Sequence, residues 1–471
     1  ESIMASYNEV NGVPSHANTW MMREVLRDEW GFEGYVVSDY YALRELNDRP
    51  GLFGHGVAES TEDAAYLGVK AGINIELPDA DVYPVLTELV QSGRLKESEL
   101  DELIRPMLEL KFRFGLFEHP YMNPDAAEAY IGHEDHRKLA LEAAEKSIIL
   151  LQNKNGAAPV NDDEIKSIAV IGPNADRVLL GGYSGTPPVY TTVLEGIKQR
   201  AGSDITVQYA EGVKITTTSG WTSDPVELST KEADLKGIQK AVQTARKADI
   251  IVLAVGGNEQ TSREAWSRSH MGDRTNLQLV GQQDTLINAL SETGKPIYAF
   301  VFNGRPLAFT NLLEKADAVF ECWYLGQETG HAVANVLFGD TNPSGKLSIS
   351  IPRSVGHIPS FYNYKPSARR GYLFDDVSPL FEFGFGLSYT RFEYGQPVLE
   401  QKQIKAGEST QVAVEVTNTG DRDGEEVVQL YIRDRFSSVT RPVKELKGFQ
   451  RVALKAGESQ KVYFDISPEV L

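Results

Sequence analysis

The hydrophobic pattern of this 471-residue sequence changes its period once, near residue 391. Before that point, short apolar runs alternate with amphipathic segments that have helical spacing. After it, apolar and polar residues alternate one by one, as in 409–434, and the alternation breaks at the turn-rich stretch NTGDRDG. The first pattern is typical of βα units on a parallel sheet, and the second of an antiparallel β-sandwich. The sequence therefore predicts a multidomain chain with α/β parts followed by an all-β part.

Composition divides the chain further. Residues 1–118 alternate strand and helix patterns, and a linker is predicted at 119–132. A second α/β region is predicted over 133–352, followed by a connector rich in proline, glycine and aromatic residues at 353–390. The alternating region, 391–471, predicts an immunoglobulin-like sandwich that lacks its last strand or two.

The second α/β region is predicted to begin with one helix over 133–153. Apolar, β-branched runs then indicate buried strands, separated by helices or loops. These runs lie at 167–172, 205–210, 250–258, 296–304 and 318–326. The pattern predicts an open sheet with helices on both faces.

Charge and cysteine content exclude several classes of function. The net charge is -19 and no basic stripe occurs, so nucleic acid and anionic lipid are not expected as partners. No apolar run approaches the ~20 residues of a membrane span. The single cysteine, Cys322, excludes an internal disulfide and a thiolate metal cluster, and its apolar surroundings indicate a buried core thiol. The chain starts without methionine, directly with a strand, and is interpreted as a fragment.

One carboxylate stands where a buried strand is predicted to end. Tyr35, Val36 and Val37 form an apolar run after a glycine, and Ser38 and Asp39 follow at once. Active sites of parallel αβ barrels lie at the carboxyl ends of the strands, which makes Asp39 a catalytic candidate. The alternative is that Asp39 caps the next helix. These residues alone leave both interpretations open.

A long polar loop supplies two more carboxylates. It follows the predicted strand 250–258 and places Glu259 and Glu264 among three arginines, which are Arg263, Arg268 and Arg274. A loop of this length in a compact domain is usually functional or disordered. Alternatively, its glutamates pair with the arginines on the surface. Two carboxylates from separate domains that meet in one cleft would make a glycosidase pair.

Other motifs carry no cofactor chemistry. Glycines in 169–175 and 254–259 follow strands, but neither stretch completes a dinucleotide or phosphate-binding pattern. His133 and His136 lie at a helix start without a third ligand nearby, so helix-start chemistry is expected rather than a metal. Asp79 lies in a proline-bounded turn and is interpreted as a loop residue.

Several motifs, in their order along the chain, resemble glycoside hydrolase family 3, the β-glucosidase and β-xylosidase family. The matching stretches are IMASYNEVNGVPSHAN (3–18), VLRDEWGFEGYVVSDY (25–40) and AGINIELP (71–78) for the end of its barrel, 139–153 and 324–359 for its second domain, and FEFGFGLSYTRFEY (381–394) and RPVKELKGFQRVAL (441–454) for its last domain. The resemblance covers essentially the whole chain. It implies the C-terminal part of a (β/α)8-type barrel, then an α/β sandwich domain, then an incomplete fibronectin type III-like β-sandwich.

The resemblance also implies catalytic roles by position. Asp39 matches the catalytic nucleophile. Glu264 matches the acid/base of the bacterial pattern, with Glu259 as the second choice. An apolar neighbour, Trp266, is expected to favour the protonated form that the acid needs.

Three tyrosines are expected at the sugar. Tyr7 matches a tyrosine that hydrogen-bonds near the nucleophile. Tyr40 stands where β-glucosidases commonly have tryptophan and xylosidases often have cysteine, and an aromatic ring there suits stacking on a sugar face. Tyr183 lies in a loop that is near the cleft in relatives.

Two departures from the family pattern affect the site. Position 257 is glycine where a glutamate is frequent, so a polar contact of the loop is expected to be missing. Only the last part of a barrel of about 250 residues is present, so the family's sugar-holding Asp, Arg and Lys-His residues lie upstream of Glu1. The missing half of the barrel is needed for a complete site.

The implied activity is that of a retaining, exo-acting β-glucosidase on oligosaccharides or aryl β-glucosides, without metal or organic cofactor. Within the family, a β-xylosidase or a broad exo-glucan glucohydrolase is the alternative. A non-catalytic carbohydrate-binding protein is the alternative from another class. The family's usual substrates imply a periplasmic or secreted protein, and association into a homo-oligomer stays open.

Overall fold

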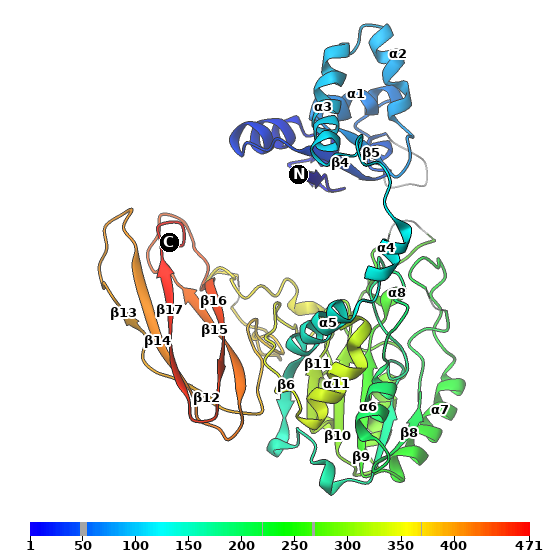
Figure 1. The fold of residues 1–471 in the computed structure, drawn as a ribbon, viewed down its shortest axis with the longest axis vertical. Coiled ribbons are helices and arrows are strands. Elements are labelled where there is room, and N and C mark those ends of the chain that lie inside the picture. The colour runs from blue at the N-terminus through cyan, green and yellow to red at the C-terminus, as the bar shows by residue number, and fades with distance from the viewer. Residues whose placement is uncertain (48–53, 219, 266–268, 369) are drawn as a thin grey trace. The chain divides into compact units, whose positions relative to one another are not determined.

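The computed structural model describes residues 1–47, 54–218, 220–265, 269–368 and 370–471. The chain forms two compact units, Glu1–Tyr130 and Ile131–Leu471, each with its own hydrophobic core (Figure 1). Among the described residues, no helix combines the length and the apolar character needed to cross a lipid bilayer.

The first unit contains a small parallel sheet in the order β1-β4-β5. Strand β4 lies in the middle, where Ile3 pairs with Val36 and Val37 pairs with Ile75. The strands are β1 (Ser2–Met4), β2 (Glu9–Val10), β3 (Val13–Pro14), β4 (Tyr35–Tyr40) and β5 (Ile75–Leu77). The helices are η1 (Ser15–Ala17), η2 (Trp20–Glu29), η3 (Arg44–Leu46), α1 (Thr61–Ala71), η4 (Tyr83–Val85), α2 (Leu86–Gln91), α3 (Glu97–Arg113) and α4 (Pro124–Tyr130).

Local sequence explains how α1 packs on this sheet. The Ser60 side chain accepts a hydrogen bond from the Asp63 N–H and caps the first turn. Gly72 ends the helix in the left-handed conformation, with φ of 93°, which glycine adopts without strain. The alanine-rich face between these ends, including Ala64 and Ala65, is fully buried in the core cluster that also contains Val36 of β4. Strand β4, which carries Asp39, is therefore paired on both sides and shares its core with α1.

The segment predicted as a linker contains helix α4. Pro124 is its first residue, a position that tolerates proline because no backbone donor is needed there. The first unit ends with the same helix, at Tyr130.

The second unit begins with a six-stranded sheet in the order β6-β11-β10-β9-β7-β8. All its pairings are parallel except β11 with β6, which is antiparallel. The strands are β6 (Ile149–Asn153), β7 (Ser167–Ile171), β8 (Thr206–Ala210), β9 (Ile250–Gly256), β10 (Ile297–Phe302) and β11 (Ala318–Glu321). The helices are α5 (Glu134–Ser147), η5 (Lys154–Gly156), η6 (Asp162–Glu164), α6 (Val193–Ala201), α7 (Lys231–Arg246), α8 (Glu259–Ser262), α9 (Gln283–Ser291), α10 (Thr310–Lys315), η7 (Gly326–Glu328), α11 (Thr329–Phe338) and η8 (Val355–His357).

Helices cover both faces of this sheet, as the sequence predicts. One core cluster joins the sheet to α5, α6 and α11, which lie together on one face (Figure 1). A second cluster joins the other face to α7, α9 and α10. Cys322 follows β11 in the first cluster and is fully buried, as predicted. Burial raises the pKa of its thiol.

The prediction of one helix over 133–153 is wrong for its last part. Helix α5 ends at Ser147, Ile148 is extended, and 149–153 form strand β6 at the edge of the sheet. The run of Ile148, Ile149, Leu150 and Leu151 is buried on all sides, which a strand between two helical layers satisfies and a one-sided amphipathic helix does not.

At the helix start, the His133 side chain accepts a hydrogen bond from the Asp135 N–H. His133 therefore serves as the helix cap, as predicted.

The last part of the second unit is an antiparallel β-sandwich. Strand β14 (Thr410–Asn418) pairs with β12 (Phe392–Tyr394), β13 (Val398–Leu399) and β17 (Ser459–Ile466), and β15 (Gly424–Ile432) pairs with β16 (Glu445–Leu454). Alternate residues of these strands face inward, including Val416, Val428 and Val462. The period-2 pattern of the sequence corresponds to this inward and outward alternation.

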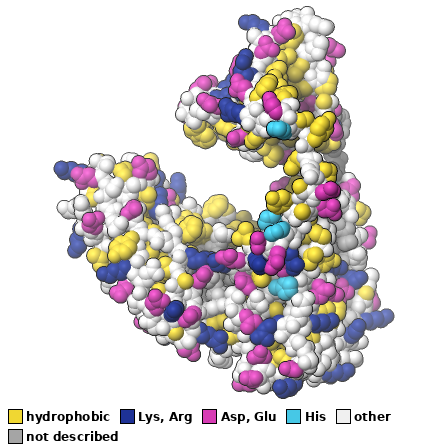
Figure 2. Space-filling model, in the orientation of Figure 1, with side chains coloured by type: hydrophobic (Ala, Val, Ile, Leu, Met, Phe, Trp, Pro, Cys, Tyr) yellow, Lys and Arg dark blue, Asp and Glu magenta, His cyan; other side chains and the backbone are white. Residues whose placement is uncertain are grey.

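Charged side chains of both signs are interspersed over the surface. Figure 2 shows this mixture on one face, without a continuous basic stripe among the described residues drawn there.

Candidate active site

Asp39 is the next-to-last residue of β4, at the carboxyl end of the parallel sheet of the first unit. The Leu77 N–H donates to Ser38 Oγ at 2.9 Å, and the register between β4 and β5 shifts between Val37 and Tyr40. An irregularity of this kind redirects side chains at the end of a strand. Asp39 is half-buried there.

The alternative that Asp39 caps the next helix is wrong. That helix, η3, begins after Leu43 and has no side-chain cap. Asp39 Oδ1 instead accepts the N–H of its neighbour Tyr40 at 2.7 Å, and the Asp39 carbonyl accepts the Ala42 N–H at 3.2 Å. The second carboxylate oxygen has no protein donor among the described residues, so it is available to a ligand.

A buried histidine holds the backbone of Asp39. The Asp39 N–H donates to His16 Nε2 at 3.1 Å, and His16 is 1% exposed. Burial lowers the pKa of His16 to about 4, with a smaller contribution from the charge of His55. Nε2 can accept a hydrogen bond only when it carries no proton. Sequence reasoning did not identify His16, because its contact spans 23 residues and no local pattern marks it.

Two of the predicted tyrosines lie beside Asp39. The Tyr7 hydroxyl donates to the Tyr40 carbonyl oxygen at 2.6 Å. Tyr40 is 56% exposed, so its ring is accessible. The following residue, Tyr41, has φ of 61°, a conformation that side chains other than glycine rarely adopt, and its N–H donates to Leu77 at 2.8 Å. The structure therefore places Tyr7, Asp39 and Tyr40 together at one edge of the sheet.

A second carboxyl group lies near this edge. Burial raises the pKa of Glu45, and the charge of Asp39 adds to the rise, whereas His55 and Arg44 lower it. Glu45 and Asp39 are thus close enough to interact electrostatically.

In the second unit, Glu264 follows strand β9 and the short helix α8. Strands β7 and β9 are neighbours although β8 lies between them in sequence, so the chain order reverses at this point of the sheet. Ligands of open α/β sheets bind at the carboxyl ends of the strands beside such a reversal. The Asn174 side chain, after β7, donates to the Gly257 carbonyl oxygen, after β9, at 3.0 Å and joins the two strand ends. Glu264 lies in the loop that leaves this edge and is exposed.

Arg263 fixes the backbone next to Glu264. Its guanidinium is buried and donates to four backbone carbonyls, those of Trp221, Ser223, Asp224 and Met271, at 2.6 to 3.0 Å. Arg305 donates in turn to the Arg263 carbonyl oxygen at 3.0 Å. The loop is thereby tied to two other segments.

Gly272 makes this arrangement possible. A Cβ atom at position 272 would collide with the Arg263 carbonyl oxygen and with the backbone of Glu264. Only glycine allows the returning chain to pass this close to the candidate acid/base.

The alternative that the loop glutamates pair with the arginines is not supported. Arg274 donates to Asn276 Oδ1 at 3.1 Å and to the Gln278 carbonyl at 2.5 Å. Among the residues that the structure describes, neither Glu259 nor Glu264 forms an ion pair. Arg268 and Trp266, on which two of the expectations depend, lie outside the described residues.

Glu259 and Glu264 differ in their surroundings. Glu259 is half-buried, and its Oε1 accepts the Leu180 N–H at 3.2 Å, so it holds the 180 loop. Glu264 has no hydrogen-bond partner among the described residues and faces solvent. Glu264 is therefore the more accessible of the two carboxyl groups.

Tyr183 forms part of an aromatic pair. Its ring is 90% exposed and lies 4.6 Å from the ring of Trp221, between centroids, at an angle of 54°. Because the Trp221 carbonyl accepts from Arg263, this pair and the Glu264 loop belong to one hydrogen-bonded assembly. Sequence reasoning missed Trp221, although a tryptophan in a Ser/Thr/Gly-rich loop is an unusual residue.

The glycine at 257 has a steric reason. A Cβ atom there would lie 2.9 Å from Thr261 Oγ1, which accepts the N–H of Asn258, the N-cap of helix α8. Asn174 Oδ1 and Asn303 Oδ1, both buried in this region, lack hydrogen-bond partners in the part of the chain that the structure describes.

Neither candidate carboxylate lines a described cavity. One cavity, of about 390 Å³ in the first unit, includes Glu33 and Asn74, which precede β4 and β5, so it lies at the opposite end of the strands from Asp39. Among the described residues, no group of three or more His, Cys, Asp or Glu side chains gathers as a metal ion would require.

Glycoside hydrolases use a pair of carboxyl groups, and Asp39 and Glu264 are the candidates for such a pair in this chain. Family models support this class over most of the chain. The glycosyl hydrolase family 3 N-terminal domain matches residues 1–110, its C-terminal domain matches 148–389, and a fibronectin type III-like domain matches 426–471. The chain belongs to glycosyl hydrolase family 3, and the predicted fold class is confirmed.

Individual relatives are similar over almost the whole chain. A β-xylosidase of Formosa agariphila is 41% identical over 99% of this chain and 63% of its own length. The periplasmic β-glucosidase of Salmonella typhimurium is 38% identical over 100% of this chain and 63% of its own length. A solved β-glucosidase from Erythrobacter marinus has a TM-score of 0.94 at 43% identity, over 99% of this chain and 62% of that one. The chain therefore spans less than two thirds of the length of these relatives.

Proposed function

We propose that the protein containing this chain is a retaining, exo-acting β-glucosidase that removes terminal β-D-glucosyl residues from oligosaccharides. Asp39 is the nucleophile and Glu264 the acid/base. The observation that carries the proposal is the position of Asp39, at the carboxyl end of β4 with one oxygen available, its backbone held by His16, and Tyr7 and Tyr40 beside it. The relatives named β-glucosidase support the substrate class.

In the first step, the ionised Asp39 carboxylate attacks the anomeric carbon while the bond to the leaving oxygen breaks. Glu264 gives its proton to that oxygen. In the second step, Glu264 takes a proton from water, the water attacks the anomeric carbon, and Asp39 leaves as a carboxylate. Retaining chemistry requires the two carboxyl groups about 5–5.5 Å apart in the working enzyme.

The protein around each carboxylate supports these roles. Nε2 of neutral His16 fixes the Asp39 peptide, so the carboxylate keeps one orientation during attack. The Arg263 contacts and Gly272 fix the backbone at Glu264 while leaving its side chain accessible. Tyr40 and the pair of Tyr183 with Trp221 offer ring faces on which sugars can stack.

The test is azide rescue in the natural full-length protein. In Asp39→Ala, kcat on an aryl β-glucoside should fall by several orders of magnitude, and azide should restore turnover as the α-glucosyl azide, because it attacks opposite to the leaving group. In Glu264→Ala, azide should instead give the β-glucosyl azide, because it attacks the glycosyl-enzyme. Normal hydrolysis by Asp39→Ala would refute the assignment.

Glu259→Ala is the matched control for the acid/base. Glu264→Ala should lose far more activity on cellobiose than on an activated aryl glucoside, because a good leaving group needs no proton. Glu259→Ala should lower activity on both substrates alike, since it removes the hydrogen bond that holds the Leu180 backbone. The reverse result would assign the acid/base to Glu259.

A β-xylosidase is the second candidate, because a relative at 41% identity carries that name. Parallel kcat/KM values on p-nitrophenyl glucoside and xyloside decide between them. The exposed ring of Tyr40 favours the larger sugar, which has more surface to stack on it. We further propose that other residues complete the barrel around Asp39 and that the protein is periplasmic or secreted, as the name of the Salmonella relative suggests.

A further inference from the structure

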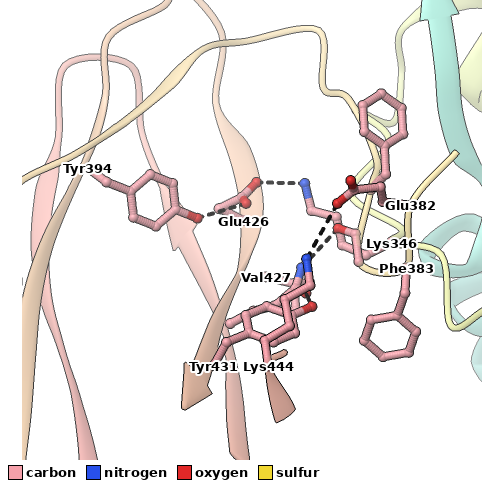
Figure 3. A pocket seen from close by; sticks show the side chains of 11 residues that line it. Lys346, Glu382, Phe383, Tyr394, Glu426, Val427, Tyr431 and Lys444 are labelled. Atoms are coloured by element: carbon pink, nitrogen blue, oxygen red, sulfur yellow. Dashed lines mark hydrogen bonds and ion pairs between the residues drawn. The ribbon is translucent and has the colours of Figure 1, made fainter. Parts of the chain in front are cut away.

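A cavity of about 370 Å³ lies within the second unit, where the connector after the α/β domain meets the β-sandwich. Its lining includes Lys346 before the connector, Glu382 and Phe383 in the connector, and Glu426 and Tyr431 of the sandwich (Figure 3). Sites for small molecules usually have volumes of about 300–1,000 Å³ and combine apolar walls with a few polar groups. This cavity has the size and the mixed lining of such a site.

The charges of the lining cancel in pairs. Lys346 Nζ lies 3.0 Å from Glu426 Oε2, and Lys444 Nζ lies 3.4 Å from Glu382 Oε2 (Figure 3). The Tyr394 hydroxyl donates to Glu426 at 2.8 Å, and burial raises its pKa, so it stays a neutral donor. A lining with both signs of charge favours a neutral polar ligand over an ion.

One of these pairs keeps hydrogen-bonding capacity for a ligand. Among the described residues, the Lys444 side chain donates only to Glu382, and the Glu382 side chain accepts only from Lys444. An ammonium group has three donors, and a carboxylate has about four acceptor positions. The two side chains are 39% and 64% exposed, so a ligand can approach them from solvent. Neighbouring hydroxyl groups, which both donate and accept, match this pair.

Aromatic rings supply the apolar wall. The Tyr431 ring lies 5.4 Å from Lys444 Nζ. The Phe383 ring stacks on Tyr362 at 4.1 Å with an angle of 15°, and Tyr362 meets Tyr431 edge-on at 6.1 Å. These contacts fix the ring orientations, and fixed rings beside hydroxyl-binding groups suit a sugar, which has an apolar face and a polar edge.

We propose that this cavity binds a neutral glycosyl unit of an oligosaccharide or glucan. Neither of the proposed catalytic residues, Asp39 and Glu264, is among the residues that line it. The proposal rests on the proposed function only for the class of ligand. Its effect would be to hold a carbohydrate on the protein away from the bond that is cleaved.

The experiment measures binding of cellotetraose by isothermal titration calorimetry. The background is Asp39→Ala in the full chain, which prevents hydrolysis. Lys444→Ala removes a donor of the lining, and because the pair is exposed, its loss should cost little stability. Val427→Trp replaces a small side chain of the lining with a bulky indole, which should fill part of the cavity. Lys461→Ala, on the exposed side of β17, is the matched control.

Binding should be retained in the Asp39→Ala background and in Lys461→Ala, and it should weaken at least tenfold in Lys444→Ala and in Val427→Trp. Equal affinity in all four chains, or no binding in the background, would overturn the proposal. Hydrolysis assays on the same substitutions without the Asp39 change separate the two proposals. Normal turnover by Asp39→Ala would refute the hydrolytic assignment and leave the cavity proposal standing.

Discussion

His16 links the candidate nucleophile to pH. Its Nε2 accepts the Asp39 N–H, and burial lowers its pKa from 6.5 to about 4. Between these two values the unfolded chain binds a proton that the folded chain does not, so the free energy of unfolding falls as the pH falls through this window. A difference of this size corresponds to about 3 kcal/mol over the window.

We expect His16→Gln to flatten this dependence. The glutamine side-chain oxygen can accept the same N–H but does not titrate, so stability should change less between pH 7 and pH 4.5. Urea unfolding at both values measures the change, with His119→Gln, an exposed histidine of the same unit, as the control. If His16→Gln lost as much stability as the parent between the two pH values, buried neutral His16 would not be the source of the pH dependence.

Single residues were predictable to different degrees. Asp39 could be found because an apolar run that stops in a carboxylate marks a strand end. His16 and Arg263 could not, because both act on backbone groups far away in sequence. The sequence left open a pairing of Arg263 with the loop glutamates, whereas its guanidinium donates to the carbonyls of 221–224 and of Met271.

At the scale of elements, the carboxyl end of β11 holds a buried acid. Glu321 is 0% exposed, and burial raises its pKa to about 8. Asn303 Nδ2 lies 3.0 and 3.2 Å from its two oxygens. From pH 4.5 to pH 8 the folded chain keeps a proton that the unfolded chain loses, so stability should fall as the pH rises. Over this whole pH range the free energy of unfolding should fall by about 5 kcal/mol.

Glu321→Gln should remove this loss. The neutral amide keeps an acceptor for Asn303 and cannot ionise, so the variant should match the parent near pH 5 and exceed it by several kcal/mol near pH 8. Guanidinium unfolding of both chains at the two pH values tests this, and Glu292→Gln, on the surface of the same domain, controls for net charge. If the free energy of unfolding changed with pH by the same amount in the parent and in Glu321→Gln, a protonated Glu321 would be excluded.

The same scale shows where pattern reasoning failed. The strands of the central sheet were predictable because buried parallel strands are uniformly apolar. Strand β6 was not, because its apolar run follows a helix without a glycine or proline to separate them. Its pairing with β11, from 165 or more residues away, decides its conformation.

The chain comprises two units with separate cores, and each unit contains a buried residue whose pKa is shifted by burial. His16 belongs to the first unit and Glu321 to the second. Acidification from pH 6.5 to pH 4.5 should therefore destabilise the first unit and stabilise the second.

Differential scanning calorimetry should accordingly resolve two transitions whose separation grows toward low pH. His16→Gln should shift only one of them, and Glu321→Gln only the other. A single transition that both substitutions move would show that the units unfold together.

The order of the domains was predictable at this scale, because the change of hydrophobic period near residue 391 marks the start of the sandwich. The carboxyl-end position of Asp39 followed from strand direction. The connections that hold Glu264 did not, since they depend on loops that carry no periodic signal.

The dependence of Glu264 on Arg263 limits how this loop can be engineered. The Arg263 guanidinium donates only to backbone carbonyls, those of 221–224 and of Met271. The contact therefore depends on the backbone conformation there and not on the side chains. A graft of residues 259–274 onto another scaffold would keep only the Met271 carbonyl among the four acceptors of that guanidinium, so the backbone at Glu264 would be held less firmly. A successful transfer of the loop would have to include residues 221–224 as well.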